Sequence, residues 1–137
     1  MKKVLVSILL IVCLAVSAVY AMGFKRGFMD SIPAPQLISP VSETADITGK
    51  DYLDFKWIVI GLMDIDYCDF KIYKGYNAYG DNLILKEQVF TPDRDFRVKA
   101  DTFEDGQVYT WVLKEVSYSG LKGDTAYNSF RIIKNSK

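Results

Sequence analysis

The stretch FEDGQVYTW, residues 103–111, decides how the rest of this 137-residue sequence is interpreted. Its acidic residues and Gly106 are typical of a turn. The run that follows, residues 108–116, places Tyr109, Trp111 and Leu113 on one face of an extended chain. The stretch therefore predicts a turn that leads directly into a half-buried β-strand.

The same period of two recurs on the N-terminal side of this stretch. Residues 52–59 place Phe55 and Trp57 on one face and the charged Asp54 and Lys56 on the other. Residues 67–74 repeat the pattern, and residues 41–50 and 117–124 are polar and are expected to form loops. The seven predicted strands cover residues 36–38, 52–59, 67–74, 83–90, 96–101, 108–116 and 128–134.

Composition also favours a β-rich protein. The sequence holds nine Tyr, eight Phe and two Trp, and aromatic side chains pack well on pleated surfaces. No segment beyond the N-terminal apolar run shows the three-and-four spacing of an amphipathic helix. Seven strands at near-regular spacing with turns between them predict an all-β sandwich.

Residues 103–111 also resemble the segment before the sixth strand of fibronectin type III domains. In that family a large apolar residue stands six positions before a tyrosine, with a glycine between, and Phe103, Gly106 and Tyr109 take these places. The family's tyrosine hydroxyl bonds back to the upstream chain, an arrangement called the tyrosine corner. The resemblance implies a seven-stranded antiparallel β-sandwich with a core of Phe55, Trp57, Phe70, Ile72, Phe103, Tyr109, Trp111 and Phe130.

The similarity covers nearly all of residues 33–135, from the proline-marked first strand to the last strand around Phe130. The sequence departs from the family pattern where Phe103 replaces a leucine. A second departure is Glu115, which stands where a small or apolar residue is expected. There is no pair of cysteines separated by a tryptophan, which argues against a true immunoglobulin domain.

The N-terminal residues have the order of a secretory signal. Two lysines precede the apolar run 4–19, and small residues end at Ala21, so residues 1–21 are expected to be a cleaved signal helix. An uncleaved membrane anchor over residues 4–24 is the alternative, because that run approaches the roughly 20 residues that span a bilayer. Residues 22–32 are expected to be a linker. The protein is therefore predicted to be secreted, periplasmic or on the cell surface.

Charge and cysteine content limit the classes of partner that the protein is expected to bind. Lys plus Arg and Asp plus Glu both number 17, so no basic excess points to nucleic acid. The membrane is expected as a partner only through the N-terminal segment, and only if that segment stays uncleaved. Removing residues 1–21 leaves Cys68 as the single thiol. Its alternation with Phe70 predicts burial, and pairing between two chains is the alternative.

Catalysis has little support in the sequence. Histidine is absent, which removes the commonest general base and metal ligand, and no cofactor is expected. Two acidic clusters, one around Asp64 and one around Asp105, are consistent with calcium ligands or with solvated turns. The clusters consist of Asp64, Asp66 and Asp69, and of Asp101, Glu104 and Asp105.

A tyrosine-rich turn is the best candidate for a binding surface, since exposed tyrosines beside amides and carboxylates suit a sugar or a protein. The alternative is a turn whose aromatics fold back onto the sheet. We therefore expect a non-catalytic interaction or spacer module with a protein or glycan partner at the cell envelope. A carbohydrate-binding module and a small hydrolase using the acidic clusters are the other hypotheses. The candidate surface residues are Tyr73, Tyr76, Asn77, Tyr79, Asp81 and Asn82.

Overall fold

The computed structural model describes residues 31–60, 64–90 and 94–134. Within these residues the chain forms eight strands and two short 3-10 helices, η1 (Gly80–Asn82) and η2 (Ala100–Thr102). The predicted signal helix, and the linker up to residue 30, lie outside the described residues. The strands are β1 (Gln36–Ser39), β2 (Thr44–Asp46), β3 (Tyr52–Ile58), β4 (Ile65–Lys74), β5 (Leu83–Phe90), β6 (Asp95–Lys99), β7 (Val108–Ser117) and β8 (Lys122–Ile133).

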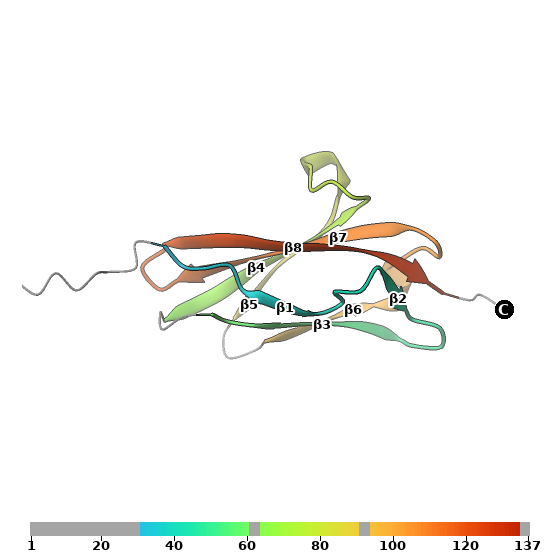
Figure 1. The fold of residues 1–137 in the computed structure, drawn as a ribbon, viewed down its shortest axis with the longest axis horizontal. Coiled ribbons are helices and arrows are strands. Elements are labelled where there is room, and N and C mark those ends of the chain that lie inside the picture. The colour runs from blue at the N-terminus through green and yellow to red at the C-terminus, as the bar shows by residue number, and fades with distance from the viewer. Residues whose placement is uncertain (1–30, 61–63, 91–93, 135–137) are drawn as a thin grey trace, which may run out of the picture. The chain divides into compact units, whose positions relative to one another are not determined.

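The strands form two sheets that pack face to face (Figure 1). One sheet has the order β1-β3-β6 and the other has the order β2-β8-β7-β4-β5. All neighbours except β2 and β8 are antiparallel. The predicted all-β sandwich is confirmed. None of the helices in the described residues has the length and hydropathy of a membrane-spanning segment.

The strand count and pairing need one correction. The prediction of seven antiparallel strands with a loop over residues 41–50 misses β2, which pairs in parallel with β8. Only Ala45 within β2 is buried, and Ile47 is buried directly after it. Three residues are too short to display a period of two, so this strand is defined by its partner and not by its own pattern.

The last strand is longer than expected. β8 begins at Lys122, inside the predicted loop 117–124, because its polar first half pairs with β7. Gly123 permits this path: a Cβ there would stand 2.9 Å from the Cβ of Ile32, closer than side chains tolerate. Ile32 is 1% exposed, so the sandwich already includes this residue of the predicted linker.

Aromatic side chains dominate the space between the sheets. The Phe55 ring lies 5.0 Å from that of Phe70 and 5.1 Å from that of Trp111, both in edge-to-face contacts. Such contacts add to the free energy of burying large apolar area. The core residues predicted from the sequence are each at most 2% exposed: Phe55, Trp57, Phe70, Ile72, Phe103, Tyr109, Trp111 and Phe130.

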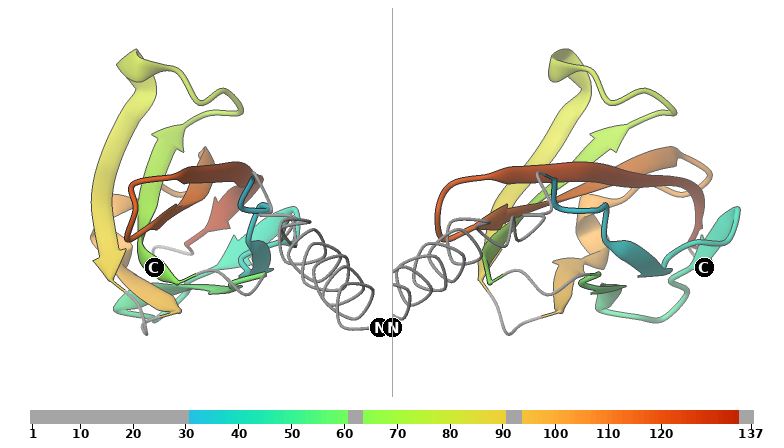
Figure 2. Two further views of the ribbon diagram at one scale, coloured as in Figure 1. Left: turned by 90° about the vertical axis from the view of Figure 1, so that its left-hand side faces the viewer. Right: turned by 60° about the vertical axis from the view of Figure 1, so that its left-hand side comes forward.

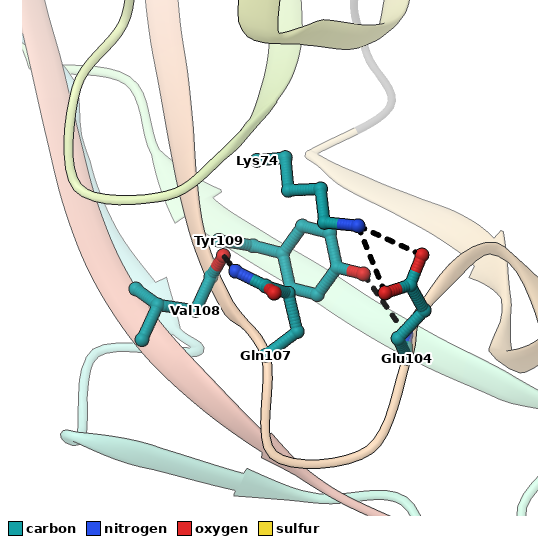
Figure 3. Close-up of polar contacts among 5 residues, drawn as sticks. All are labelled: Lys74, Glu104, Gln107, Val108 and Tyr109. Carbon is teal, nitrogen blue, oxygen red and sulfur yellow. Dashed lines mark hydrogen bonds and ion pairs between the residues drawn. The ribbon is translucent and has the colours of Figure 1, made fainter.

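A tyrosine corner closes one end of the sandwich (Figure 3). The Tyr109 hydroxyl accepts a hydrogen bond of 2.9 Å from the backbone N–H of Glu104. Gly106 makes the turn between them with a φ of 72°, a conformation that glycine adopts at little cost. The ring of Tyr109 packs edge-on against Phe103 at 5.1 Å. The predicted corner is therefore present with all three of its residues in place.

Candidate functional site

The loop that joins β4 to β5 projects from the side of the five-stranded sheet that faces away from the other sheet (Figure 2). Gly75 begins this loop, residues 75–82, with a φ of 96°, while its N–H donates to the carbonyl of Val108 at 2.8 Å. Tyr76 and Tyr79 are 68% and 69% exposed, so neither ring folds back onto the sheet. The loop therefore presents two aromatic side chains to solvent.

Other polar residues complete the tip of the loop. Asn77, Asp81 and Asn82 are exposed, and the last two belong to η1. The N–H of Asn82 donates to the carbonyl of Tyr79 at 3.0 Å, which fixes the second tyrosine to this short helical turn. Five of the six residues expected at this surface therefore lie together on the loop.

Tyr73 does not belong to that exposed set. It lies on β4 opposite Thr110 of β7, and only 9% of it is exposed. The expectation that Tyr73 joins an exposed tyrosine surface is therefore wrong. The spacing 73, 76, 79 reads as one cluster in sequence, but the chain leaves the sheet at Gly75, between the first tyrosine and the others.

The base of the loop is held by a residue that the sequence did not single out. The Thr110 hydroxyl donates to the carbonyl of Gly75 at 2.7 Å, and lies 2.7 Å from the hydroxyl of Ser129. Thr110 is 1% exposed, so these bonds are shielded from water. A β-branched residue in mid-strand gives no signal of such a role before the fold is known.

Two hollows flank the loop. One, of about 360 Å³, lies between Tyr76, β2 at Thr44 and β8 at Arg131. The other, of about 320 Å³, lies on the outer face of the five-stranded sheet and is bordered by Ala78 of the loop. The loop thus forms a wall of two concave surfaces, a common setting for ligand contacts.

The acidic cluster near Asp105 serves the fold. Lys74 Nζ lies 2.8 Å from the Glu104 carboxylate (Figure 3), and the backbone N–H of Lys134 donates to Asp105 Oδ1 at 2.6 Å. Lys134 Nζ also lies 3.6 Å from Asp101. Across residues 31–60, 64–90 and 94–134 no three acidic or cysteine side chains come close enough to hold a metal ion.

An unexpected polar cluster is buried at the opposite end of the sandwich. Glu115 is 0% exposed, and neither carboxylate oxygen has a hydrogen-bond partner among the described residues. Burial raises the pKa of this carboxyl from 4.5 to about 7, and the positive charge of Arg94 opposes the rise. The sequence marked Glu115 as a departure from the family pattern, but it did not show that the side chain turns inward.

Glu115 pairs across the sheet with Cys68, which lies in the core as the alternation predicted. Burial, and secondarily the Glu115 charge, raise the pKa of the Cys68 thiol to about 11. The Trp57 indole lies beside the thiol and slightly opposes this rise, but its N–H has no well-aligned hydrogen-bond partner in the described chain. Such a thiol stays protonated at neutral pH and is a poor nucleophile.

No protein-family model matches the sequence, and no curated protein does. Among solved structures, the third fibronectin III domain of the human KIAA0343 protein superposes with a TM-score of 0.50 and 13% identity over 85% of this chain and 95% of that one. A chain described as a myokine structure gives a TM-score of 0.53 at 16% identity, covering 75% and 99% of the two chains. These likenesses establish the fold alone: the chain is a fibronectin type III-like β-sandwich.

Proposed function

We propose that the chain is an exported, non-catalytic binding module that holds a protein or another surface component of the cell envelope through the loop 75–82. The observation that carries this proposal is the pair of exposed rings, Tyr76 and Tyr79, on a loop whose base is fixed by Thr110. Tyrosine supplies a large amphipathic contact area at low conformational cost. A fixed base lowers the ordering cost of binding further.

The test compares two pairs of exposed tyrosines. Tyr76→Ala with Tyr79→Ala removes the loop rings. Tyr118→Ala with Tyr52→Ala removes rings that are 71% and 47% exposed, on the β7–β8 turn and on β3 of the other sheet. Binding of the purified full-length protein to isolated envelopes is measured by co-sedimentation. We expect the loop pair to lower binding at least tenfold and the control pair to leave it unchanged, and equal binding by all three proteins contradicts the proposal.

A carbohydrate ligand is the alternative, because amide and carboxylate groups of Asn77, Asp81 and Asn82 adjoin the two exposed rings. Sugars bind to such sites by stacking a ring face on an aromatic side chain while polar neighbours bond to the hydroxyls. A glycan array decides between the ligands. Signal that disappears in the Tyr76→Ala and Tyr79→Ala double variant favours a sugar, whereas silence with intact envelope binding favours a protein.

The proposed location at the cell envelope rests on the apolar run 4–19 and the small residues that end at Ala21. N-terminal sequencing of the protein from its own cells is the direct test. A chain that starts at residue 22 supports export by a cleaved signal. A chain that keeps residues 4–24 and partitions with membranes supports the anchored form, and a full-length chain in the soluble cytoplasmic fraction contradicts both.

A further inference from the structure

The hollow of about 320 Å³ on the outer face of the five-stranded sheet is lined by three lysines from three different strands. They are Lys71 of β4, Lys114 of β7 and Lys122 of β8. We call this hollow, with Ala78 of the loop at its border, the lysine groove. Because the groove draws residues from positions 69 to 125, it exists only in the folded chain.

The charges of the lysine groove are not neutralised locally. Among the residues that the structure describes, none of the three groove lysines has a carboxylate within 4.0 Å, whereas Lys74 and Lys134 each have one. Asp69 is the single acidic residue among the described residues that line the groove. Three lysines against one aspartate leave an excess of two positive charges in a chain whose basic and acidic residues are equal in number. Charge complementarity therefore favours an anionic occupant.

The neutral lining of the groove discriminates between anionic ligands. Val112 and the largely covered Tyr73 supply apolar surface. The Tyr73 ring is too buried to offer a face for stacking a sugar, and Thr125 supplies the only other hydroxyl among the described residues of the lining. An acidic sugar would leave most of its hydroxyls without partners. A peptide with carboxylates beside an aliphatic side chain matches both the lysines and the apolar surface.

We propose that the lysine groove binds an acidic segment of a partner protein, in which Asp or Glu side chains face Lys71, Lys114 and Lys122 and an aliphatic side chain contacts Val112. This inference rests on the proposed function, since it names the partner chemistry for the surface beside the loop. Lysine suits the role because its flexible ammonium attracts single carboxylates without requiring bidentate geometry. Binding is expected to weaken as salt screens the exposed charges.

The test uses a fluorescent, capped peptide of repeated Glu-Glu-Leu and the full-length protein, with anisotropy as the readout. Lys71→Gln with Lys114→Gln removes two groove charges, while Lys56→Gln with Lys99→Gln removes two exposed charges on the other sheet. We expect the groove pair to weaken binding about tenfold, as befits two partly exposed charges. The control pair leaves binding unchanged, a Lys-Lys-Leu peptide does not bind, and circular dichroism verifies that all variants fold.

Several outcomes overturn the inference. They are no binding of the acidic peptide at low salt, equal loss in both lysine pairs, and tighter groove-dependent binding of polygalacturonate or of phosphatidylglycerol vesicles. Self-association that requires Lys71 and Lys114, detected by sedimentation without peptide, would replace the partner segment by a second copy. Loss of envelope binding in the Tyr76 and Tyr79 variant tests the proposed function separately, so that proposal can stand if the acidic peptide fails.

Discussion

The two ends of the β-sandwich satisfy their polar groups very differently. At the corner end, the Tyr109 hydroxyl bonds to the Glu104 backbone, and Lys74 pairs with the Glu104 carboxylate. At the opposite end, the Glu115 carboxylate and the Trp57 indole are buried without hydrogen-bond partners in the described chain. β7 contributes to both ends, since Tyr109 pairs with Lys74 and Glu115 pairs with Cys68.

The two ends of one strand, β7, thus show what a buried polar group does with and without a hydrogen-bond partner. A buried polar group with a partner stabilises a single geometry, whereas one without a partner carries its full desolvation cost. The corner end should therefore respond to loss of its hydrogen bond, and the Glu115 end should respond to pH. The following variants test that contrast, from the largest expected effect to the smallest.

The largest effect is expected at Glu115, because burial raises the pKa of this carboxyl from 4.5 to about 7. The folded state then binds more protons than the unfolded state between these values, so the free energy of unfolding falls as pH rises through this window. A shift of this size corresponds to a loss of about 3 kcal/mol, complete just above neutrality. Urea denaturation from pH 4 to pH 8 measures it.

Glu115→Gln is the matched control for that experiment, because it keeps the shape and cannot ionise. Burial raises the pKa of the neighbouring Cys68 thiol to about 11, so this thiol does not titrate in the same window. We expect the variant to lose most of the pH dependence and to be the more stable protein at pH 8. If the free energy of unfolding depended on pH in the same way in both proteins, Glu115 would be accessible to water and the prediction would be wrong.

Tyr109→Phe removes the hydroxyl of the corner and leaves the ring against Phe103. We expect a loss of about 1.5 kcal/mol, since a partly buried hydrogen bond to the backbone is lost without a cavity. Thermal or urea unfolding at pH 5, where the Glu115 carboxyl is largely protonated, isolates the effect. A variant as stable as the wild type would mean that water replaces the hydroxyl at no cost.

The two tryptophans provide a finer comparison within the core. The Trp111 indole donates to the carbonyl of Pro40 at 3.0 Å, whereas that of Trp57 has no partner in the described residues. Trp→Phe removes similar ring area at both places. Trp111→Phe should therefore cost about 1 kcal/mol more than Trp57→Phe, the worth of one hydrogen bond. Equal urea midpoints for the two variants would contradict this difference between the two indoles.

The smallest effect is expected for Lys74→Gln. The ion pair with Glu104 is exposed, with 42% and 67% of the two side chains accessible to solvent. Exposed ion pairs contribute little to stability, and salt screens them. The urea midpoint of the variant should lie close to that of the wild type at low salt, and any difference should vanish when salt is added. A large loss of stability in this variant would show that the ion pair helps to hold the tyrosine corner in place.

Much of this structure could be predicted from local pattern. Strict alternation around Phe55, Phe70 and Trp111 located long strands, since a period of two is visible wherever a strand buries one face. β2 and the first half of β8 could not be found in this way. Their residues are polar or few, and they are extended because β8 pairs with β2 and β7. Such strands depend on partners that lie far away in the sequence.

The candidate site, too, could be predicted from the sequence only in part. The loop with Tyr76 and Tyr79 was recognisable because its residues are contiguous and rich in turn formers. Composition and spacing were likewise enough to predict the β-sandwich and its tyrosine corner, because alternation and a tight glycine turn depend only on residues that are neighbours in sequence. The burial of Tyr73 and Glu115 and the meeting of three lysines emerge only when the sheets pack, since each depends on atoms that distant strands bring together.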